Sequence, residues 1–159
     1  MSEDAQGLIE RLRLAPHPEG GWYRQLHRSG LKVQTPAGER AALTTIYYLL
    51  EQNATSRWHV VDADEVWHFY AGAPFDLLIY CPAREQLSRR TLGSPAEGHD
   101  SVAVVTAGSW QAGRSTGSYS LMGCTVGPGF EFTGFQFVSA LADHERHFKG
   151  EMRSLADLL

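Results

Sequence analysis

The sequence lacks most features that mark secreted, redox-active or nucleic-acid-binding proteins. Only two cysteines occur in 159 residues, Cys81 and Cys124, and their spacing matches no metal-binding or redox motif. Reduced thiols are therefore expected, with a single disulfide as the alternative. The formal net charge of -4 provides no basic face for binding nucleic acid.

Long hydrophobic runs are also missing. The longest apolar stretch, residues 41–50, is interrupted by Thr44 and Thr45 and is too short to span a bilayer. The first residues, Met1 to Asp4, are acidic where a secretory signal is basic. The chain has no internal repeat, nucleophile elbow, phosphate loop or dinucleotide-binding fingerprint. These features favour a cytoplasmic protein without a membrane partner.

The composition does provide for a packed core, because 43% of the residues are hydrophobic. The length suits one domain over residues 1–159. Helical spacing of Ala5, Leu8, Ile9 and Leu12 predicts an N-terminal helix over about residues 4–14. A helical tail is expected over about residues 143–158, with Asp143 as its N-terminal cap.

The residues between these helices, about 20–138, have the pattern of an all-β protein. Short runs of β-branched and aromatic residues are separated by Gly and Pro at short intervals. The expected strands are 22–27, 41–50, 58–61, 65–70, 75–80, 86–91, 101–105, 109–112, 119–126 and 130–138. Many short strands of this kind indicate a sandwich or a barrel.

Strand 41–50 is apolar at both odd and even positions, which predicts cover on both of its faces. The second cover is either a partner subunit or the N-terminal helix. Because a large apolar face is seldom left in water, we expect a homodimer.

The densest group of reactive side chains lies between Ser56 and Gly72. His59 precedes an acidic turn and Glu65 opens the next strand, so the turn is expected to bring the two side chains together. His59 suits acid/base chemistry or metal binding because its ordinary pKa lies near neutrality; a hydrogen-bonded core histidine is the alternative. A buried Glu65 would need a cation, a metal or protons as its partner.

The spacing of this stretch resembles the first motif of the cupins, which reads His-x-His, three or four residues, Glu, six residues, Gly. His59, Glu65 and Gly72 occupy the first-histidine, glutamate and glycine positions. Val61 stands where the motif has its second histidine.

Three other segments extend the resemblance over roughly residues 8 to 138. Residues 106–111 match the spacing of the second cupin motif, with Gln111 at its histidine position. Together with residues 17–24 and 127–132, they resemble the cupin subfamily that is known as a domain of unknown function (DUF985) and described as predicted sugar epimerases. The resemblance implies a jelly-roll barrel with short helices at both ends.

The resemblance also implies a small-molecule ligand, of a sugar or nucleotide-sugar kind, and an epimerase or isomerase that uses histidine acid/base chemistry. A metal-dependent cupin enzyme and a non-catalytic ligand-binding or sensing domain are the alternatives. His59, Glu65 and Gln111 are the metal ligands to expect, as a weak divalent-metal site, since Val61 removes one imidazole. A buried amide that satisfies neighbouring groups is the alternative for Gln111.

His59, Glu65 and His68 are the catalytic candidates. Alternation places His68 on the face opposite Glu65, and its inclusion depends on the subfamily resemblance. A pocket tyrosine, such as Tyr47 or Tyr119, would serve as the acid. The substrate-binding candidates are aromatic rings that stack on sugars and an arginine that holds anions: Tyr47, Arg57, Trp67, Phe69, Trp110 and Tyr119. Core packing for the rings and a surface position for the arginine are the alternatives.

Overall fold

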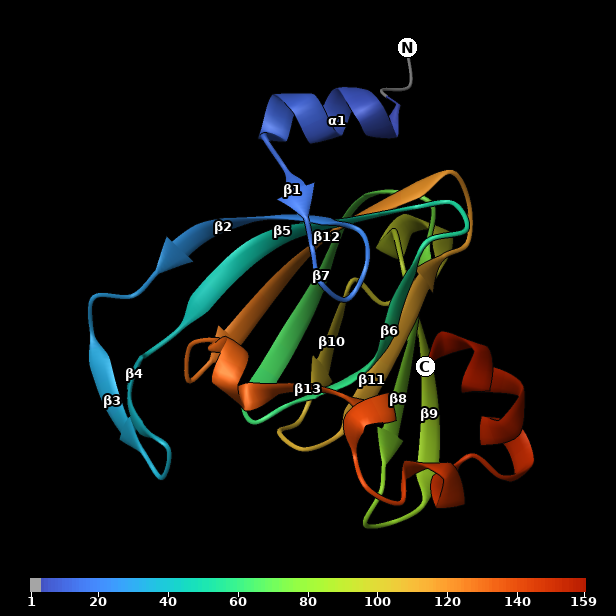
Figure 1. The fold of residues 1–159 in the computed structure, drawn as a ribbon. Helices are drawn as coiled ribbons and strands as arrows, with labels where there is room; N and C mark the ends of the chain where they lie inside the picture. The colour runs from blue at the N-terminus through green and yellow to red at the C-terminus, as the bar shows by residue number, and fades with distance from the viewer. Residues whose placement is uncertain (1–3) are drawn as a thin grey trace.

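The computed structural model describes residues 4–159, and two antiparallel β-sheets face each other across its interior (Figure 1). The six-stranded sheet has the order β1-β2-β5-β12-β7-β10. Its strands are β1 (Ala15–Pro16), β2 (Trp22–Arg28), β5 (Thr44–Glu51), β7 (Asp64–Gly72), β10 (Val102–Val105) and β12 (Tyr119–Gly127).

The second sheet has five strands in the order β13-β6-β11-β8-β9. They are β6 (Thr55–Val61), β8 (Phe75–Cys81), β9 (Gln86–Leu92), β11 (Trp110–Ser115) and β13 (Phe135–Phe137). The expected all-β jelly-roll architecture is confirmed, and most of the predicted strands match observed ones within a few residues.

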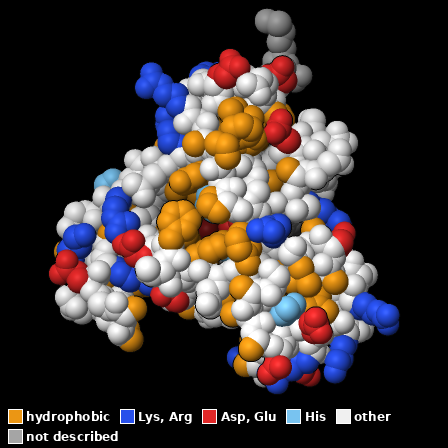
Figure 2. Space-filling model, viewed as in Figure 1, with side chains coloured by type: hydrophobic (Ala, Val, Ile, Leu, Met, Phe, Trp, Pro, Cys, Tyr) orange, Lys and Arg blue, Asp and Glu red, His pale blue; other side chains and the backbone are white. Residues whose placement is uncertain are grey.

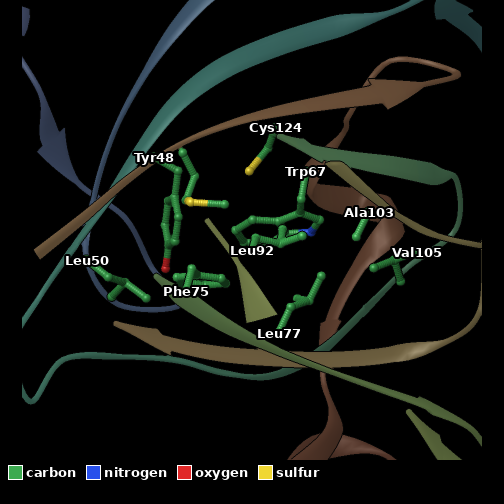
Figure 3. Packing of buried hydrophobic residues seen from close by; sticks show 10 residues of the cluster. Tyr48, Leu50, Trp67, Phe75, Leu77, Leu92, Ala103, Val105 and Cys124 are labelled. Carbon is green, nitrogen blue, oxygen red and sulfur yellow. The ribbon is translucent and has the colours of Figure 1, made fainter. Parts of the chain in front are cut away.

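Side chains that alternate inward from both sheets form the central core (Figure 3). Trp67 of β7 stacks on Phe75 of β8, with ring centroids 5.1 Å apart, and so joins the two sheets. Tyr48 of β5 meets the Trp67 ring edge-on at 5.7 Å. All three rings are almost completely buried, which fixes the strands that carry the neighbouring polar residues.

Helix α1 (Ala5–Leu12) covers part of the outer face of the six-stranded sheet. The Asp4 side chain caps it by accepting from the Gly7 backbone N–H at 2.7 Å. The apolar stripe of the helix packs Leu8 and Ile9 against Leu49 of β5. The helix therefore supplies some of the cover that the apolar pattern of strand 41–50 requires, while the homodimer stays a prediction.

The C-terminal tail forms two 3-10 segments, η4 (His144–His147) and η5 (Gly150–Leu158), beside the five-stranded sheet (Figure 1). The predicted capping by Asp143 is wrong: this residue has a left-handed backbone (φ 60°) and its side chain makes no cap hydrogen bond. Apolar residues of η5 pack on the outer face of the sheet around Trp58. The Trp58 indole N–H donates to the Leu155 carbonyl at 2.9 Å.

Three parts of the chain differ from the predicted elements. The hairpin β3 (Lys32–Thr35) and β4 (Gly38–Ala41) projects from the body (Figure 1) and was not among the expected strands. The predicted strand 130–138 is wrong, because it contains the 3-10 turn η2 (Phe132–Gly134), short β13 and the start of η3 (Val138–Ala140). A further 3-10 turn, η1 (Pro95–Glu97), precedes β10.

Cys81 and Cys124 are free thiols, as expected. In the part of the chain that the structure describes, no helix has the length and apolar character needed to cross a membrane.

Candidate functional site

A cavity of about 280 Å³ opens between the two sheets. In Figure 2, acidic side-chain atoms are visible at the bottom of a hollow that hydrophobic side chains surround. The fifteen lining residues combine polar and titratable groups with apolar walls: His17, Glu19, Tyr23, Gln25, Thr44, Ile46, Tyr48, His59, Val61, Glu65, Cys124, Val126, Phe130, Phe132 and Phe135.

His59 and Glu65 reach this cavity from opposite sheets. The turn after β6 carries the chain from the five-stranded to the six-stranded sheet, so His59 lies on one sheet and Glu65 on the other. Both residues line the cavity, as the motif spacing predicted. Val61 shares the face of His59 by strand alternation and lines the cavity too, which confirms its expected orientation.

The hydrogen bonds of His59 determine its tautomer. Its Nδ1 lies 2.7 Å from the Arg57 carbonyl oxygen, so Nδ1–H donates there. In the neutral ring Nε2 then carries no proton, and it lies 3.2 Å from Glu19 Oε2. Burial lowers the pKa of His59, and the nearby Glu65 carboxylate opposes that effect.

Glu19 is the carboxyl partner of His59, and it was not a candidate from the sequence. Its other oxygen accepts the Ser56 hydroxyl at 3.0 Å. Burial raises the pKa of Glu19, and the neighbouring His17 opposes this. The raised pKa of Glu19 and the lowered pKa of His59 both favour the uncharged forms of the two groups at the contact between His59 Nε2 and Glu19 Oε2.

The loop that positions Glu19 depends on its two glycines. Gly20 has a φ of 110°, and a Cβ there would collide with the Thr55 carbonyl oxygen. Gly21 also has a positive φ, and a Cβ there would meet the Leu49 carbonyl. The Tyr48 hydroxyl donates to the Gly20 carbonyl at 2.8 Å. Only glycine fits where the loop approaches the Thr55 and Leu49 carbonyls this closely, and this approach places the Glu19 side chain inside the barrel.

Glu65 is the second buried carboxyl group of the cavity. Burial raises its pKa to about 7, against the opposing effect of His59. Gln111 donates its side-chain N–H to Glu65 Oε2 at 2.6 Å, and its oxygen accepts the Trp67 indole N–H at 2.9 Å. Glu65 can therefore exchange a proton near neutral pH, held in place by an amide whose oxygen is already occupied.

The predicted metal ligands His59, Glu65 and Gln111 are neighbours, because Gln111 pairs with His59 between β11 and β6 and donates to Glu65, but their donor atoms are engaged by different partners. The Gln111 oxygen accepts from the Trp67 indole N–H, and Gln111 is not a lining residue of the cavity. The free nitrogen of His59 is directed at Glu19. Among residues 4–159, no group of three or more His, Cys, Asp or Glu side chains is placed to hold a metal ion. As folded, the donor set does not fit a divalent metal.

None of the six predicted substrate-binding residues is a lining residue of the cavity. Trp67 and Phe69 belong to the central core, whereas Tyr47 and Tyr119 pack with α1 on the outer face of the six-stranded sheet. Neither tyrosine is therefore placed to act as the pocket acid. Alternation explains the outward position of Tyr47, because its neighbour Tyr48 faces inward, whereas Trp67 and Phe69 share the inward face of Glu65 and pack in the core instead.

The remaining predicted residues also lie outside the cavity. Trp110 packs with the tail on the outer face of the five-stranded sheet, in the apolar cluster that also contains Trp58. The Arg57 guanidinium lies 4.1 Å from the centroid of the Phe137 ring. His68 faces away from Glu65, as alternation required, with its ring parallel to Tyr70 at 6.5 Å.

The lining residues that the sequence did not single out come from strands β2, β5, β12 and β13 and from two connecting segments. The loop before β2 supplies His17, and the segment after β12 supplies Phe130 and Phe132. The available signal was a histidine and a glutamate beside a Gly-Gly pair, and an aromatic run after Pro128. Both segments carry the family resemblance, but their spacing alone gives no hint that they meet His59.

Comparison with solved structures supports the same fold. A protein from Shewanella oneidensis is 33% identical, with a TM-score of 0.80, over 96% of this chain and 97% of that chain. A hypothetical protein from Leishmania major is also 33% identical, with a TM-score of 0.77, over 84% and 86% of the two chains. Oxalate decarboxylase from Bacillus subtilis shares the fold alone, at 12% identity and a TM-score of 0.59, over 91% of this chain and 36% of that chain.

Comparison with curated proteins gives no significant match. The family described as Cupin superfamily (DUF985) matches residues 6–138, which include both faces of the cavity. The chain therefore belongs to the cupin superfamily, in the family DUF985.

Proposed function

We propose that the chain binds a small sugar-like molecule in this cavity and acts on it as an isomerase of the epimerase kind. The observation that carries the proposal is the placement of two proton-exchanging units on facing sheets. His59 lies on the five-stranded sheet and is met by Glu19 from the loop before β2, and Glu65, with a pKa of about 7, lies on the six-stranded sheet.

Epimerisation beside a carbonyl group requires removal of a carbon-bound proton on one face and its return on the other. The C–H bond breaks, its electrons form the enediolate, and one unit takes the proton. The other unit then delivers a proton to the opposite face, so no atom or electron is gained or lost overall. Glu65 suits either step, because a group with a pKa near the working pH both gives and accepts protons readily.

The neutral His59 ring supports the same scheme. With Nδ1–H held by the Arg57 carbonyl, a proton can be exchanged only at Nε2, where Glu19 lies. The pair therefore functions as one unit that is neutral overall with one proton bound. Burial keeps water from competing at this position.

The test is exchange of carbon-bound hydrogen with solvent. Neutral aldoses, ketoses and keto sugars are incubated with the protein in D₂O, and deuterium incorporation is followed by NMR and mass spectrometry. Glu65→Gln and His59→Gln are expected to lower the exchange rate by about 10²- to 10⁴-fold. His68→Gln, with its ring outside the cavity, serves as the matched control and should exchange normally.

Two outcomes would contradict the proposal. Equal loss of exchange in His68→Gln would show that the cavity is not the site of proton transfer. Saturable binding of a sugar without any exchange would favour the non-catalytic ligand-binding or sensing domain.

A further inference from the structure

The charged groups that line the cavity are all acidic or weakly basic. Glu19 and Glu65 provide two carboxyl groups, and His17 and His59 provide two imidazoles. Burial lowers the pKa of both histidines, which favours their neutral forms. Among the lining residues of the described chain there is no Lys or Arg. The polar end of the cavity is therefore neutral or negative near pH 7.

The arginines on segments that border the cavity are engaged by other groups. Arg40 is buried and donates to Asp62 at 2.8 Å. Arg57 lies over the Phe137 ring, and Arg28 forms an ion pair with a carboxylate on the loop after β12. Figure 2 shows a basic side chain beside the hollow and not within its ring of hydrophobic groups. A buried anion would thus find no cation at the depth of Glu65.

Glu65 itself lacks a positive partner among the described ion pairs. It is 8% exposed and is held by the Gln111 amide. A buried carboxylate without a counter-charge is costly, and a second negative charge beside it costs more. A ligand cation would offset this cost, whereas an uncharged ligand would leave Glu65 in its protonated form.

The walls near the mouth are aromatic. Phe130, Phe132 and Phe135 meet edge-to-face, with ring centroids 5.0, 6.1 and 6.5 Å apart. Aromatic rings attract cations through their faces and pack against the apolar faces of neutral molecules. Neither interaction favours a phosphate or a carboxylate.

We propose that the cavity selects its ligand by charge, taking an uncharged or positively charged small molecule and rejecting anions. This inference rests on the proposed function and narrows its ligand class. Free neutral sugars and amino sugars fit the rule, whereas sugar phosphates, sugar acids and nucleotide sugars do not.

Charge selection by the cavity can be tested without knowing the ligand. The measurement is the rate at which charged and neutral reagents modify a thiol on the cavity lining. Because the native Cys124 already lines the cavity, Ile46→Cys is made in a Cys124→Ala background and places a single thiol on the lining, and the native Cys81 lies outside it as an internal control. Methanethiosulfonates that carry trimethylammonium, hydroxyl or sulfonate groups are compared at pH 8, where Glu65 is ionised. Peptide mapping by mass spectrometry separates the modified sites, and rates are divided by those with free mercaptoethanol.

The ratio of cationic to anionic labelling should be at least about tenfold higher at the introduced thiol than at Cys81, with the neutral reagent between. Glu65→Gln should lower that ratio several-fold without changing the ratio at Cys81. Gln25→Cys, at an exposed lining position, provides a second reporter if Ile46→Cys does not fold.

An anionic reagent that labels the cavity thiol as fast as the cationic one would overturn the charge rule. Because labelling needs no substrate, that result would leave proton exchange by His59 and Glu65 unaffected. Conversely, absence of exchange in D₂O together with a high labelling ratio would reject the isomerase and keep the charge rule.

Discussion

The side-chain nitrogen of Gln111 lies 2.6 Å from Glu65 Oε2, and this hydrogen bond opposes the rise in the pKa of Glu65 that burial causes. The amide oxygen of Gln111 accepts the Trp67 indole N–H, so its orientation is fixed by the core. The proton affinity of a candidate catalytic group is thus linked to a tryptophan on the same strand.

Gln111→Leu should therefore raise the pKa of Glu65 further above 7 and leave the Trp67 N–H without an acceptor. Loss of the buried hydrogen bonds should lower the free energy of unfolding by about 1–3 kcal/mol. The pKa is measured by NMR titration of the carboxyl carbon, and stability by urea denaturation. The same substitution at exposed Gln136 should change neither; an unchanged Glu65 titration would contradict the linkage.

The raised pKa of Glu65 predicts a pH dependence of stability. Between its ordinary value of 4.5 and about 7, the folded chain keeps a proton on Glu65 that the unfolded chain releases. Its contribution to stability is therefore present at low pH and is lost as the pH rises through this window, by about 3 kcal/mol in total.

His59 acts in the opposite sense, because its lowered pKa makes the unfolded chain take up a proton first as the pH falls. Comparing the stability of the native chain with that of Glu65→Gln separates the contribution of Glu65 from that of His59. The difference in unfolding free energy between them should change between pH 4.5 and 7 and stay constant above pH 8. A difference that does not vary with pH would show that Glu65 titrates normally.

Val61→His should create a metal site that the native donor set does not form. Val61 lines the cavity beside His59, so a second imidazole there can approach the same ion. We expect tighter binding of Ni²⁺ or Zn²⁺ by calorimetry of metal-stripped protein, with a stability loss of about 1–3 kcal/mol from overpacking.

Val60→His is the matched control for this variant, because Val60 packs on the other side of β6. Equal metal affinity of the two variants would contradict the convergence of positions 59 and 61. Tight stoichiometric metal in the native chain would show that the cavity rearranges to supply other ligands.

The C-terminal tail should contribute strongly to stability. Leu155 is 4% exposed against the five-stranded sheet, so Leu155→Ala should lower the free energy of unfolding by about 2–5 kcal/mol. The backbone acceptor for Trp58 remains, which limits the loss to packing. Exposed Arg153→Ala is the control, and thermal or urea unfolding that ranks the two variants equally would mean the tail is not docked in solution.

We expect the chain to form a homodimer through an exposed apolar face. Tyr70, Val102 and Val104 on the outer face of the six-stranded sheet are 51%, 47% and 55% exposed. Light scattering should give about twice the 17.6 kDa chain mass. If this face is the contact, Val104→Glu should yield the monomer, whereas Leu31→Glu, at a more exposed position outside this face, should not. A native monomer at micromolar concentration would contradict the dimer.

The strands and the His59–Glu65 pair were accessible from the sequence because they depend on local patterns. Alternation correctly placed His68 away from Glu65, and the motif spacing correctly placed Val61 in the cavity. The aromatic walls were predicted wrongly, since Trp110 and Tyr119 have the composition of a pocket wall but lie on outer faces. Composition does not distinguish an inner from an outer face.

Sequence patterns did not identify Glu19 as the partner of His59, for a different reason. Glu19 lies 40 positions earlier in the chain and reaches His59 only because a two-glycine loop passes close to β6. Likewise, Gln111 had the correct motif position, but its orientation depends on the Trp67 indole across the interior. Such contacts depend on the packing of the two sheets and leave no periodic signal in the sequence.

The place of β12 between β5 and β7 has a consequence for biosynthesis. Both neighbours leave the ribosome well before residues 119–127, so each exposes an unpaired edge until the late strand arrives. Until then the six-stranded sheet is divided between β5 and β7, and the cavity lacks the part of its wall that Cys124 and Val126 supply. A nascent chain stalled before residue 119 should therefore be a substrate for chaperones, and its risk of aggregation should end only when that strand is inserted.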